Sequence, residues 1–214
     1  ADSEKFIFPK TIRVSHELDP APTRAAILNS MKLPVILRPL DTHTGAGATL
    51  IESEDQLLSE IARRPYSEFY AIDYHDCQSE DGLYRRYRLI CAGDSWTTNS
   101  LHIATSWNVH GEDAGKIGWL ENGYDREEVA FHEDCADLIG GDPKDVFGDI
   151  LDRTALDIYG FDFGFLKNGR LIVFEVNAAM SMGLDNYFMR FPYREPYEDR
   201  MRSFIESYFF ARKA

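Results

Sequence analysis

The stretch GFDFGFLKNGRLIVFEVNAAM, residues 160–180, decides the fold of this chain. Two apolar runs flank Asn168-Gly169, a dipeptide that favours a tight β-hairpin because a type I′ turn needs positive φ at both central residues. A two-residue loop would fix the register between the two strands. That register pairs Lys167 with Arg170, Gly164 with Val173, and Asp162 with Glu175.

Side chains alternate between the two faces of a strand, so the expected hairpin has an apolar face and a polar face. The apolar face would carry Phe161, Phe163, Phe165, Ile172, Phe174 and Val176 toward the core. The polar face would place Asp162 opposite Glu175, with Asn177 two residues further along the same side.

Opposed residues of this kind have Cβ atoms about 4.5–5.5 Å apart, and like charges at that distance destabilise a sheet. A hard divalent cation held by oxygen ligands would compensate for the repulsion. The alternative is a solvated hairpin face on which the two carboxylates tolerate each other.

The composition indicates a folded protein that does not bind nucleic acid. The chain has 214 residues, 44% hydrophobic and 13% aromatic, which suffice for one domain or two small lobes. A formal net charge of −13 argues against nucleic acid, which would require a basic stripe. It does not argue against ATP, because a local basic pocket can bind phosphates on an acidic protein.

Three features bear on the location of the chain. Its three cysteines, Cys77, Cys91 and Cys135, are odd in number and lack metal-ligand spacing, which favours a reducing cytoplasm. No apolar run approaches the roughly 20 residues that cross a bilayer, so we expect no membrane partner. The chain opens ADSEKF without a methionine, so we expect it to be a fragment of a longer protein.

The pattern along the chain predicts an α+β protein with two lobes, residues 1–73 and 74–214, and a polar boundary at 75–82. In the first lobe we expect an extended segment at 6–14, with Pro9 at a strand start, and strands at 34–38 and 67–73. We expect helices at 22–31 and from Ser53, with its capping box to Gln56, to Pro65. In the second lobe we expect a hairpin of strands 84–92 and 96–106, then helices at 125–139, 143–157 and 195–212. The last helix would bury Met201, Phe204, Ile205, Tyr208 and Phe209.

The segment PVILRPLDTHTGAGATLI, residues 34–51, predicts a strand, a glycine-containing turn and a second strand. Gly45 and Gly47 would let the backbone approach a ligand closely, and successive N–H groups there could form an anion nest. Arg38 at the strand end would add charge-assisted hydrogen bonds to phosphate oxygens. An ordinary hairpin with a flexible tip, in which His43 is an exposed loop residue, fits the same sequence.

Arg86 and Arg88 fall on one face of the strand 84–92, where they could clamp a triphosphate or an anionic substrate. On a protein this acidic they could equally form surface ion pairs. A metal-bridged phosphate requires carboxylates, a glycine turn and arginines together. The conjunction of all three predicts a nucleotide site between the two lobes.

At this point the chain resembles the ATP-grasp superfamily over essentially its whole length. FDFGFLKNGRLIVFEVNAA is similar to the magnesium hairpin of D-alanine–D-alanine ligases and glutathione synthetases, which implies that Asp162, Glu175 and Asn177 bind Mg²⁺. YRRYRLICAGD is similar to the strand whose arginine binds phosphate or an acyl phosphate. The resemblance gives that role first to Arg88 and then to Arg86.

The same resemblance implies nucleotide contacts in the first lobe. PVILRPLDTHTGAG is similar to the strand and loop that bind phosphates, which assigns such contacts to Arg38, His43, Gly45 and Gly47. The strand end Tyr70-Ala71-Ile72-Asp73 lies where the family binds adenine through the backbone and ribose through a carboxylate. The Arg-Pro pair and the loop histidine also resemble the ATP-grasp module of tetratricopeptide-repeat proteins.

The sequence departs from the family pattern at two places in its first part. Arg38 stands where the family has a lysine, which keeps the charge but replaces a point donor by a planar fork. An earlier phosphate-binding lysine would lie upstream; Arg13 could replace it, although a solvated charge at a sheet edge is the simpler interpretation of Arg13. The resemblance also leads us to expect that an N-terminal domain, which completes the acceptor site in the family, is missing from this chain.

The resemblance implies an α+β ATP-grasp fold in which two lobes with antiparallel sheets enclose ATP and Mg²⁺. The expected activity is an ATP-dependent carboxylate–amine ligase that forms an acyl phosphate and then an amide. Its substrates would be a small-molecule or peptide carboxylate and an amine. The alternatives are a non-catalytic nucleotide-binding or regulatory module, a phosphotransferase on the same fold, and a protein with this fold and no ligand.

Overall fold

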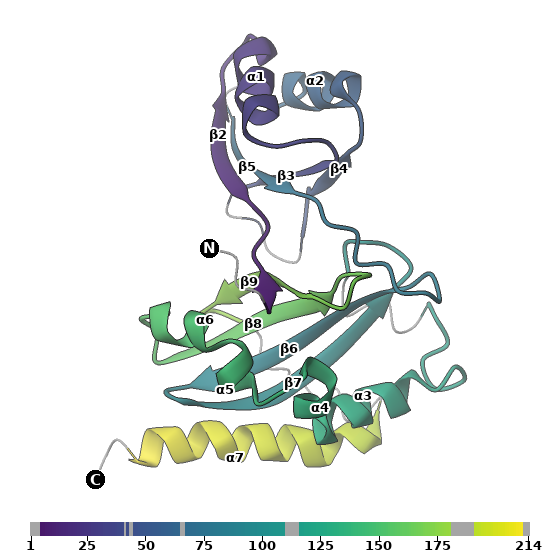
Figure 1. Ribbon diagram of the computed structural model, residues 1–214, viewed down its shortest axis with the longest axis vertical. Coiled ribbons are helices and arrows are strands. Elements are labelled where there is room, and N and C mark those ends of the chain that lie inside the picture. The colour runs from purple at the N-terminus through teal and green to yellow at the C-terminus, as the bar shows by residue number, and fades with distance from the viewer. Residues whose placement is uncertain are drawn as a thin grey trace. The chain divides into compact units, whose positions relative to one another are not determined.

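The computed structural model describes residues 5–40, 42, 45–64, 67–109, 116–180 and 191–211. The protein is an α+β fold with two sheets in which antiparallel pairing predominates (Figure 1). It divides into two compact units, Phe8–Asp76 on the one hand and Ala1–Ile7 with Cys77–Ala214 on the other. The chain therefore passes from one unit to the other after Ile7 and again after Asp76.

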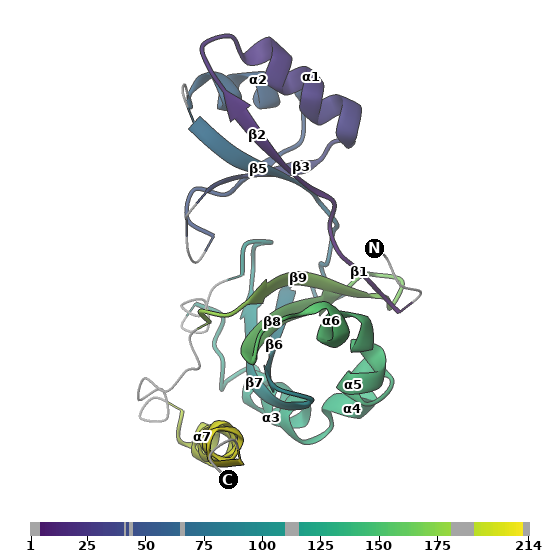
Figure 2. The same ribbon diagram turned by 90° about the vertical axis from the view of Figure 1, so that its left-hand side faces the viewer.

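The unit Phe8–Asp76 is a four-stranded antiparallel sheet in the order β2-β5-β3-β4, with two helices side by side on one face (Figure 2). Its strands are β2 (Thr11–His16), β3 (Val35–Pro39), β4 (Thr49–Ile51) and β5 (Ser67–Asp73), and its helices are α1 (Pro20–Ser30) and α2 (Glu54–Ala62). Its core comprises Val14, Ile27, Met31, Val35, Leu37, Ile51, Leu57, Ile61, Phe69 and Ala71.

Both helices of this unit begin at side-chain caps. The Gln56 N–H donates to the Ser53 hydroxyl over 3.2 Å, and the Gln56 amide oxygen accepts from the Glu52 N–H over 2.9 Å, which confirms the predicted cap of α2. Helix α1 begins two residues before the predicted start because the Asp19 carboxylate accepts from the Ala21 N–H over 3.0 Å.

The other unit is built on a five-stranded sheet in the order β1-β9-β8-β6-β7, which is antiparallel except for the pair β1 and β9. Its strands are β1 (Phe6–Ile7), β6 (Tyr84–Ala92), β7 (Ser95–Ala104), β8 (Ile158–Phe165) and β9 (Leu171–Asn177). Within the extended segment predicted at 6–14, Phe6–Ile7 pairs in this sheet and Thr11–His16 in the other, with Pro9 between the two strands.

Two of the helices predicted in this unit are each divided in two, while the last helix lies where it was predicted. They are α3 (Tyr124–Glu133), α4 (Cys135–Ile139), α5 (Pro143–Val146), α6 (Gly148–Arg153), the 3₁₀ turn η3 (Pro192–Arg194) and α7 (Glu195–Ala211). The helix predicted at 125–139 is interrupted at Asp134, whose φ of −123° and ψ of 34° are not helical. The helix predicted at 143–157 is interrupted at Phe147, next to Gly148, because glycine is a poor helix former.

An aromatic core lies between the sheet and the helices α3–α6. The Tyr87 ring of β6 stacks on Phe163 of β8 at 5.3 Å and meets Phe131 of α3 edge-on at 5.1 Å. The Phe161 ring contacts Phe147, which joins α5 to α6, at 4.8 Å. Because strand side chains alternate, the residues between these aromatics, Asp162 among them, lie on the opposite face of the sheet.

The register of the central hairpin differs from the predicted one near the turn. The Gly169 N–H donates to the Leu166 carbonyl over 2.9 Å and the Leu166 N–H to the Arg170 carbonyl over 2.8 Å. With Gly169 at φ +81°, this is a wider turn that closes with a glycine bulge, not the two-residue loop. Consequently Gly164 pairs with Ile172 and not with Val173.

A bulge at Phe174 then restores the predicted register, so that Asp162 pairs with Glu175 as expected. The bulge also turns Ile172 and Phe174 away from the aromatic core, which corrects the predicted apolar face. A Cβ on Gly164 would lie 2.9 Å from the Phe174 ring, so the ring covers Gly164 on the face of Asp162. Phe174 is accordingly 41% exposed.

Helix α7 packs against β7 with a narrower apolar stripe than predicted (Figure 1). Met201 is buried, as expected, while Phe204, Ile205 and Tyr208 are half-buried. The prediction for Phe209 is wrong, because its side chain is 54% exposed. A single strand at a sheet edge offers too little surface to cover a wider face of the helix.

His132 of α3 is buried beside α7 in its neutral form. Its Nδ1 lies 2.8 Å from the Thr98 hydroxyl, and its ring stacks on Tyr197 at 4.2 Å. The Thr98 oxygen already accepts from Arg200 over 3.1 Å, so its own hydrogen is available for Nδ1. Burial, together with the charges of Arg200 and Arg194, lowers the pKa of His132 to about 3.

This lowered pKa predicts a loss of stability in mild acid. Below the unfolded pKa of about 6.5, the unfolded chain binds a proton that the folded chain does not, so the free energy of unfolding falls by about 2 kcal/mol from pH 7 to pH 5. Urea unfolding at pH 7 and at pH 5 measures this fall in the free energy of unfolding. In His132→Asn the fall should be smaller than in the wild type by about 2 kcal/mol. Equal decreases in both proteins would contradict the assignment, because all other titrations cancel in the comparison.

Candidate functional site

Five predicted site residues lie on the face of the five-stranded sheet opposite the aromatic core. Strand β8 lies between β6 and β9, so Asp162 pairs with Arg88 on one side and with Glu175 on the other. Arg86 and Asn177 lie two residues along their strands, on the same face. We call Arg86, Arg88, Asp162, Glu175 and Asn177 the charged cluster.

Asp162 is held by two arginines. The Arg88 guanidinium binds its carboxylate in a bidentate arrangement, with Nε 2.6 Å from Oδ1 and Nη2 2.8 Å from Oδ2. Arg86 Nη1 lies 3.3 Å from the same Oδ2. Asp162 itself is only 1% exposed. The repulsion between Asp162 and Glu175, which suggested a cation, is therefore compensated by two guanidinium groups in this structure.

Glu175 and Asn177 are half-buried at the end of β9. The Asn177 amide donates to Glu175 Oε1 over 2.9 Å, and its oxygen accepts from the Ala179 N–H over 2.7 Å, which turns the chain after the strand. These bonds orient the two oxygen-bearing side chains toward each other on one face.

The charged cluster has no net charge, because two carboxylates balance two guanidinium groups. Burial lowers the pKa of Arg86, while the charges of Asp162 and Glu175 act to raise it. Burial also acts to lower the pKa of Arg88, but its hydrogen bond to Asp162 and the charges of Asp162 and Glu175 outweigh this and raise it. Arg88 is thus the more tightly held of the two.

Arg86 retains an unused donor. Its Nε is buried and has no hydrogen-bond partner among the described residues. A buried N–H without a partner costs about 1–3 kcal/mol, more for a charged group, so an anionic acceptor at this atom would be stabilising.

The described part of the chain contains no group of three or more His, Cys, Asp or Glu side chains arranged to hold a metal. The cluster supplies two carboxylates and one amide, and Asp162 is occupied by arginines. Mg²⁺ usually keeps several waters and binds through one or two carboxylates plus substrate phosphates. The donor set therefore fits Mg²⁺ that arrives with a polyphosphate, and not a metal bound by protein alone.

The glycine turn joins β3 to β4 in the other unit, which confirms the strand–turn–strand pattern predicted for residues 34–51. Gly45 and Gly47 have φ of +67° and +71°, a region that favours glycine. Arg38 Nη2 donates to the Thr42 carbonyl over 2.8 Å, so this guanidinium folds onto the turn that it precedes. His43 lies outside the described residues.

The residues Tyr70-Ala71-Ile72-Asp73 form the C-terminal end of β5, which is an inner strand of the four-stranded sheet. Tyr70, Ala71 and Ile72 pair with β2 on one side and β3 on the other, so their backbone groups serve the sheet. The Asp73 N–H donates to the Lys10 carbonyl over 2.8 Å, and its carboxylate lies 3.2 Å from His75 Nε2. Of these four residues, Asp73 is the one whose side chain carries a carboxylate.

Arg13 forms an exposed ion pair with Glu68 on the neighbouring strand, with Nη2 2.6 Å from Oε2. In the structure Arg13 is therefore an exposed surface charge, in agreement with the simpler of its two interpretations. Exposed pairs of this kind contribute about 0–1 kcal/mol to stability.

Two buried glutamates form ion pairs that escaped the sequence prediction. Glu60 of α2 is 5% exposed and binds both Arg63 and Arg64, which directly follow the helix; the spacing of three and four residues was the available signal. In α3, Glu128 accepts from Arg194 Nε over 2.7 Å and from the Tyr193 hydroxyl over 2.5 Å. The second pair joins residues 66 positions apart, so no local pattern could indicate it.

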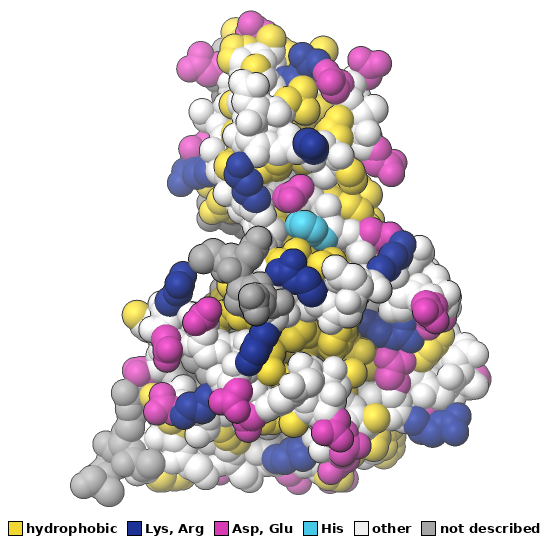
Figure 3. All heavy atoms as spheres, in the orientation of Figure 1, with side chains coloured by type: hydrophobic (Ala, Val, Ile, Leu, Met, Phe, Trp, Pro, Cys, Tyr) yellow, Lys and Arg dark blue, Asp and Glu magenta, His cyan; other side chains and the backbone are white. Residues whose placement is uncertain are grey.

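The surface gives no sign of a single-sign electrostatic interface on the face drawn in Figure 3. Acidic and basic side chains are interspersed there among polar and apolar ones. Within the described ranges, no helix has the length and apolar character needed to cross a membrane.

No family model matches the sequence, and no curated protein matches it. Solved structures similar to this chain include the ATP-grasp ligase PsnB with a precursor peptide and AMPPNP, at 14% identity and a TM-score of 0.45, covering 82% of this chain and 45% of that one. A RimK domain ATP-grasp protein from Sphaerobacter thermophilus has 17% identity and a TM-score of 0.44, covering 84% and 55%. N5-carboxyaminoimidazole synthetase from Staphylococcus aureus complexed with ADP has 15% identity and a TM-score of 0.47, covering 85% and 43%.

The first two of these structures are ATP-grasp proteins, the superfamily that the sequence motifs resemble. The chain spans about half the length of the solved structures that it matches. At these identities no residue role transfers from them, so the chemistry rests on the side chains of this chain.

Proposed function

We propose that this chain binds ATP together with Mg²⁺ through the charged cluster. The observation that supports this most directly is the buried Asp162 between Arg88 and Glu175, with an unused donor on Arg86. Two arginines and two carboxylates on one face can bind phosphates and a cation at the same time. A purely structural ion pair would require neither the second arginine nor the second carboxylate.

Glu175, Asn177 and Asp162 would hold the magnesium ion, which would neutralise phosphate charge and orient the phosphates. Glu175 and Asn177 offer oxygens from a half-buried position. Asp162 becomes available as a ligand to the extent that Arg88 and Arg86 turn from its carboxylate to the phosphates.

The two arginines would bind phosphate oxygens. The planar guanidinium fork matches a phosphate as well as it matches a carboxylate, so exchange of one for the other preserves the hydrogen bonds. Arg86 has the freer guanidinium, because its contact with Asp162 is the longer one and its Nε is unpaired among the described residues.

In the unit Phe8–Asp76 we propose that Arg38 and the glycine turn with Gly45 and Gly47 contact phosphates, and that Asp73 binds the ribose. The positive φ values of both glycines and the position of Arg38 at the start of the turn support this role. His43 remains part of the proposal from sequence alone.

We propose that the reaction is ATP-dependent amide formation from a small-molecule or peptide carboxylate and an amine. The carboxylate oxygen would attack the γ-phosphorus and ADP would leave; the amine would then attack the acyl carbon, lose a proton and expel phosphate. The arginines would stabilise charge on the transferred group. This reaction class rests on the motif resemblance.

A second candidate is a non-catalytic nucleotide-binding module. It is favoured by Arg38, which stands in place of a lysine and is bound to the Thr42 carbonyl. Incubation with Mg²⁺-ATP and mixtures of carboxylates and amines would separate the candidates. ADP with an amide product supports the ligase, a phosphorylated product without an amide supports a phosphotransferase, and binding without ADP supports the module.

Because the charged cluster has no net charge, we predict that magnesium alone does not bind to it. A divalent cation beside two guanidinium groups and two carboxylates would leave an excess of two positive charges, whereas Mg²⁺-ATP brings its own negative charge. Calorimetric titration of MgCl₂ should give no binding heat at concentrations where Mg²⁺-ATP saturates. Tight binding of magnesium without nucleotide would show that the carboxylates are not neutralised by the arginines.

We further propose a reducing, cytoplasmic location. The three cysteines, Cys77, Cys91 and Cys135, are buried free thiols. Burial raises the pKa of Cys91 to about 12, only partly opposed by its hydrogen bond with Tyr159, so that this thiol stays protonated and unreactive.

A further inference from the structure

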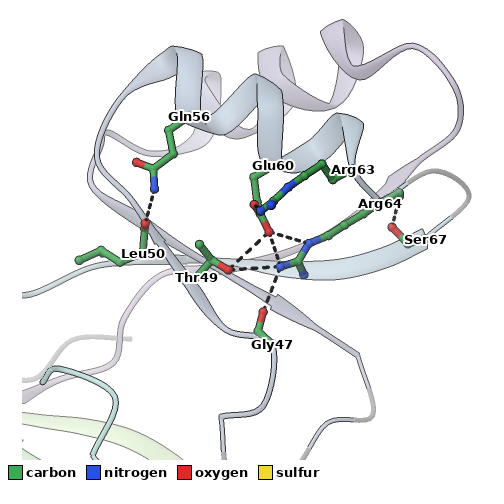
Figure 4. Close-up of polar contacts among 8 residues, drawn as sticks. All are labelled: Gly47, Thr49, Leu50, Gln56, Glu60, Arg63, Arg64 and Ser67. Carbon is green, nitrogen blue, oxygen red and sulfur yellow. Dashed lines mark hydrogen bonds and ion pairs between the residues drawn. The ribbon is translucent and has the colours of Figure 1, made fainter.

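The glycine turn is fastened to α2 by one arginine. Arg64 Nη2 donates to the Gly47 carbonyl over 3.0 Å, to the Thr49 hydroxyl over 3.3 Å and to Glu60 Oε1 over 2.6 Å (Figure 4). Its Nε lies 3.0 Å from the same Glu60 oxygen. One planar side chain thus connects the helix, the first residue of β4 and the backbone of the turn.

Glu60, Thr49 and Ser67, also drawn in Figure 4, hold Arg64 in place. Glu60 is nearly fully buried and also binds Arg63, and its Oε1 lies 3.4 Å from the Thr49 hydroxyl. The Ser67 hydroxyl donates to the Arg64 carbonyl. A side chain held from several sides loses little further conformational entropy when it binds the turn.

The turn needs this fastening at its C-terminal end. Gly47 borders an open hollow of about 390 Å³ that is also lined by Pro39, Arg64, Ser67, Glu68 and Phe69. The turn therefore has space beside it into which it could move. At the opposite end of the turn, Arg38 donates to the Thr42 carbonyl and the Thr42 hydroxyl donates to the Pro39 carbonyl, so these bonds join residues within four positions of each other.

We infer that Arg64 is a positioning residue for the glycine turn and that it sets the affinity for the phosphates through Gly47. This inference rests on the proposed nucleotide function. Arg64 fixes the backbone whose N–H groups would meet the phosphates, while its own guanidinium is used by Glu60, Thr49 and Gly47.

Arg63 provides a matched control. It directly precedes Arg64 in the chain and binds the same Glu60 carboxylate. Its side chain is exposed, and no contact between it and the glycine turn is present among the described residues. Arg63→Ala removes an ion pair of Glu60 but leaves the turn fastened. Arg64→Lys keeps a positive charge beside Glu60, yet one ammonium group cannot reproduce the fork that reaches both the carboxylate and the backbone.

The test compares amide hydrogen exchange over residues 45–51 and the dissociation constant for Mg²⁺-ATP in the full chain. Arg64→Ala should accelerate exchange and raise the dissociation constant, each by about tenfold, because two hydrogen bonds are lost, one to the turn at Gly47 and one to the strand at Thr49. Arg64→Lys should give a smaller change in both, and Arg63→Ala should resemble the wild type.

Each other outcome is decisive. Equal exchange in Arg64→Ala and Arg63→Ala would overturn the fastening, and faster exchange with unchanged affinity would overturn the positioning role. If Arg64→Ala does not fold, the same comparison is made with Arg64→Lys. Failure of the wild type to bind Mg²⁺-ATP would overturn the proposed function instead, and exchange alone would then decide whether Arg64 restrains the turn.

Discussion

Arg88→Met should lower the free energy of unfolding by about 3 kcal/mol, because it leaves the carboxylate of Asp162 buried without its bidentate partner. The loss falls at the lower end of the range for a broken buried ion pair, since Arg86 still lies 3.3 Å from the carboxylate. Urea unfolding followed by circular dichroism gives the difference directly.

The double substitution Arg88→Met with Asp162→Leu provides the internal check. Once both charges are replaced by apolar groups, most of the lost stability should return, because no buried charge remains unpaired. Arg202→Met, which breaks the exposed pair with Asp199, should cost at most about 1 kcal/mol. A double variant no more stable than Arg88→Met alone would show that Asp162 and Arg88 are not energetically linked.

Glu175→Gln should weaken Mg²⁺-ATP binding by at least about tenfold, which corresponds to about 1.4 kcal/mol. The amide keeps the size of the side chain and its contact with Asn177 but removes the anionic oxygen proposed for the metal. Unfolding stability should change little, because Glu175 is half-buried and Asp162 keeps both arginines.

Two controls make this prediction specific to the metal. With EDTA present, the variant and the wild type should bind nucleotide with similar affinity, because the difference between them comes from binding of the metal ion. The substitution Glu206→Gln on the exposed side of α7 should leave affinity unchanged. An undiminished affinity of Glu175→Gln for Mg²⁺-ATP would remove Glu175 from the proposed ligand set.

The pairing of Asp162 with Glu175 was predictable, although two irregularities of the hairpin were not. The turn closes with a glycine bulge at Gly169, which shifts the register by one residue, and the bulge at Phe174 shifts it back. The two shifts cancel at Asp162. The second shift depends on the packing of the Phe174 ring over Gly164, a tertiary contact that a strand pattern does not contain.

The charged groups of the site were recognisable from residue type, but their mutual arrangement was not. Arg86 and Arg88 reach Asp162 because β8 lies between β6 and β9, and that order joins segments more than 70 residues apart. Local periodicity could assign each side chain to a face. It could not show that both arginines contact the Asp162 carboxylate.

Short-range signals succeeded where they concern caps and turns. Ser53 with Gln56 begins one helix as predicted, and another begins at residue 143, the predicted start. Periodicity over longer spans failed at Asp134, where the backbone leaves the helical conformation although the side chain forms no capping hydrogen bond. The fastening of Gly47 by Arg64 combines a residue that follows α2 with a turn 17 positions earlier, so only the folded chain reveals it.

The most direct test of the charged cluster as a nucleotide site is calorimetric titration of Mg²⁺-ATP into the wild-type chain, after circular dichroism has shown that the sample is folded. We predict saturable binding that disappears when EDTA removes the metal and that magnesium alone does not reproduce. Absence of any binding by a well-folded sample would contradict the assignment, and the cluster would then be a buried structural ion-pair network.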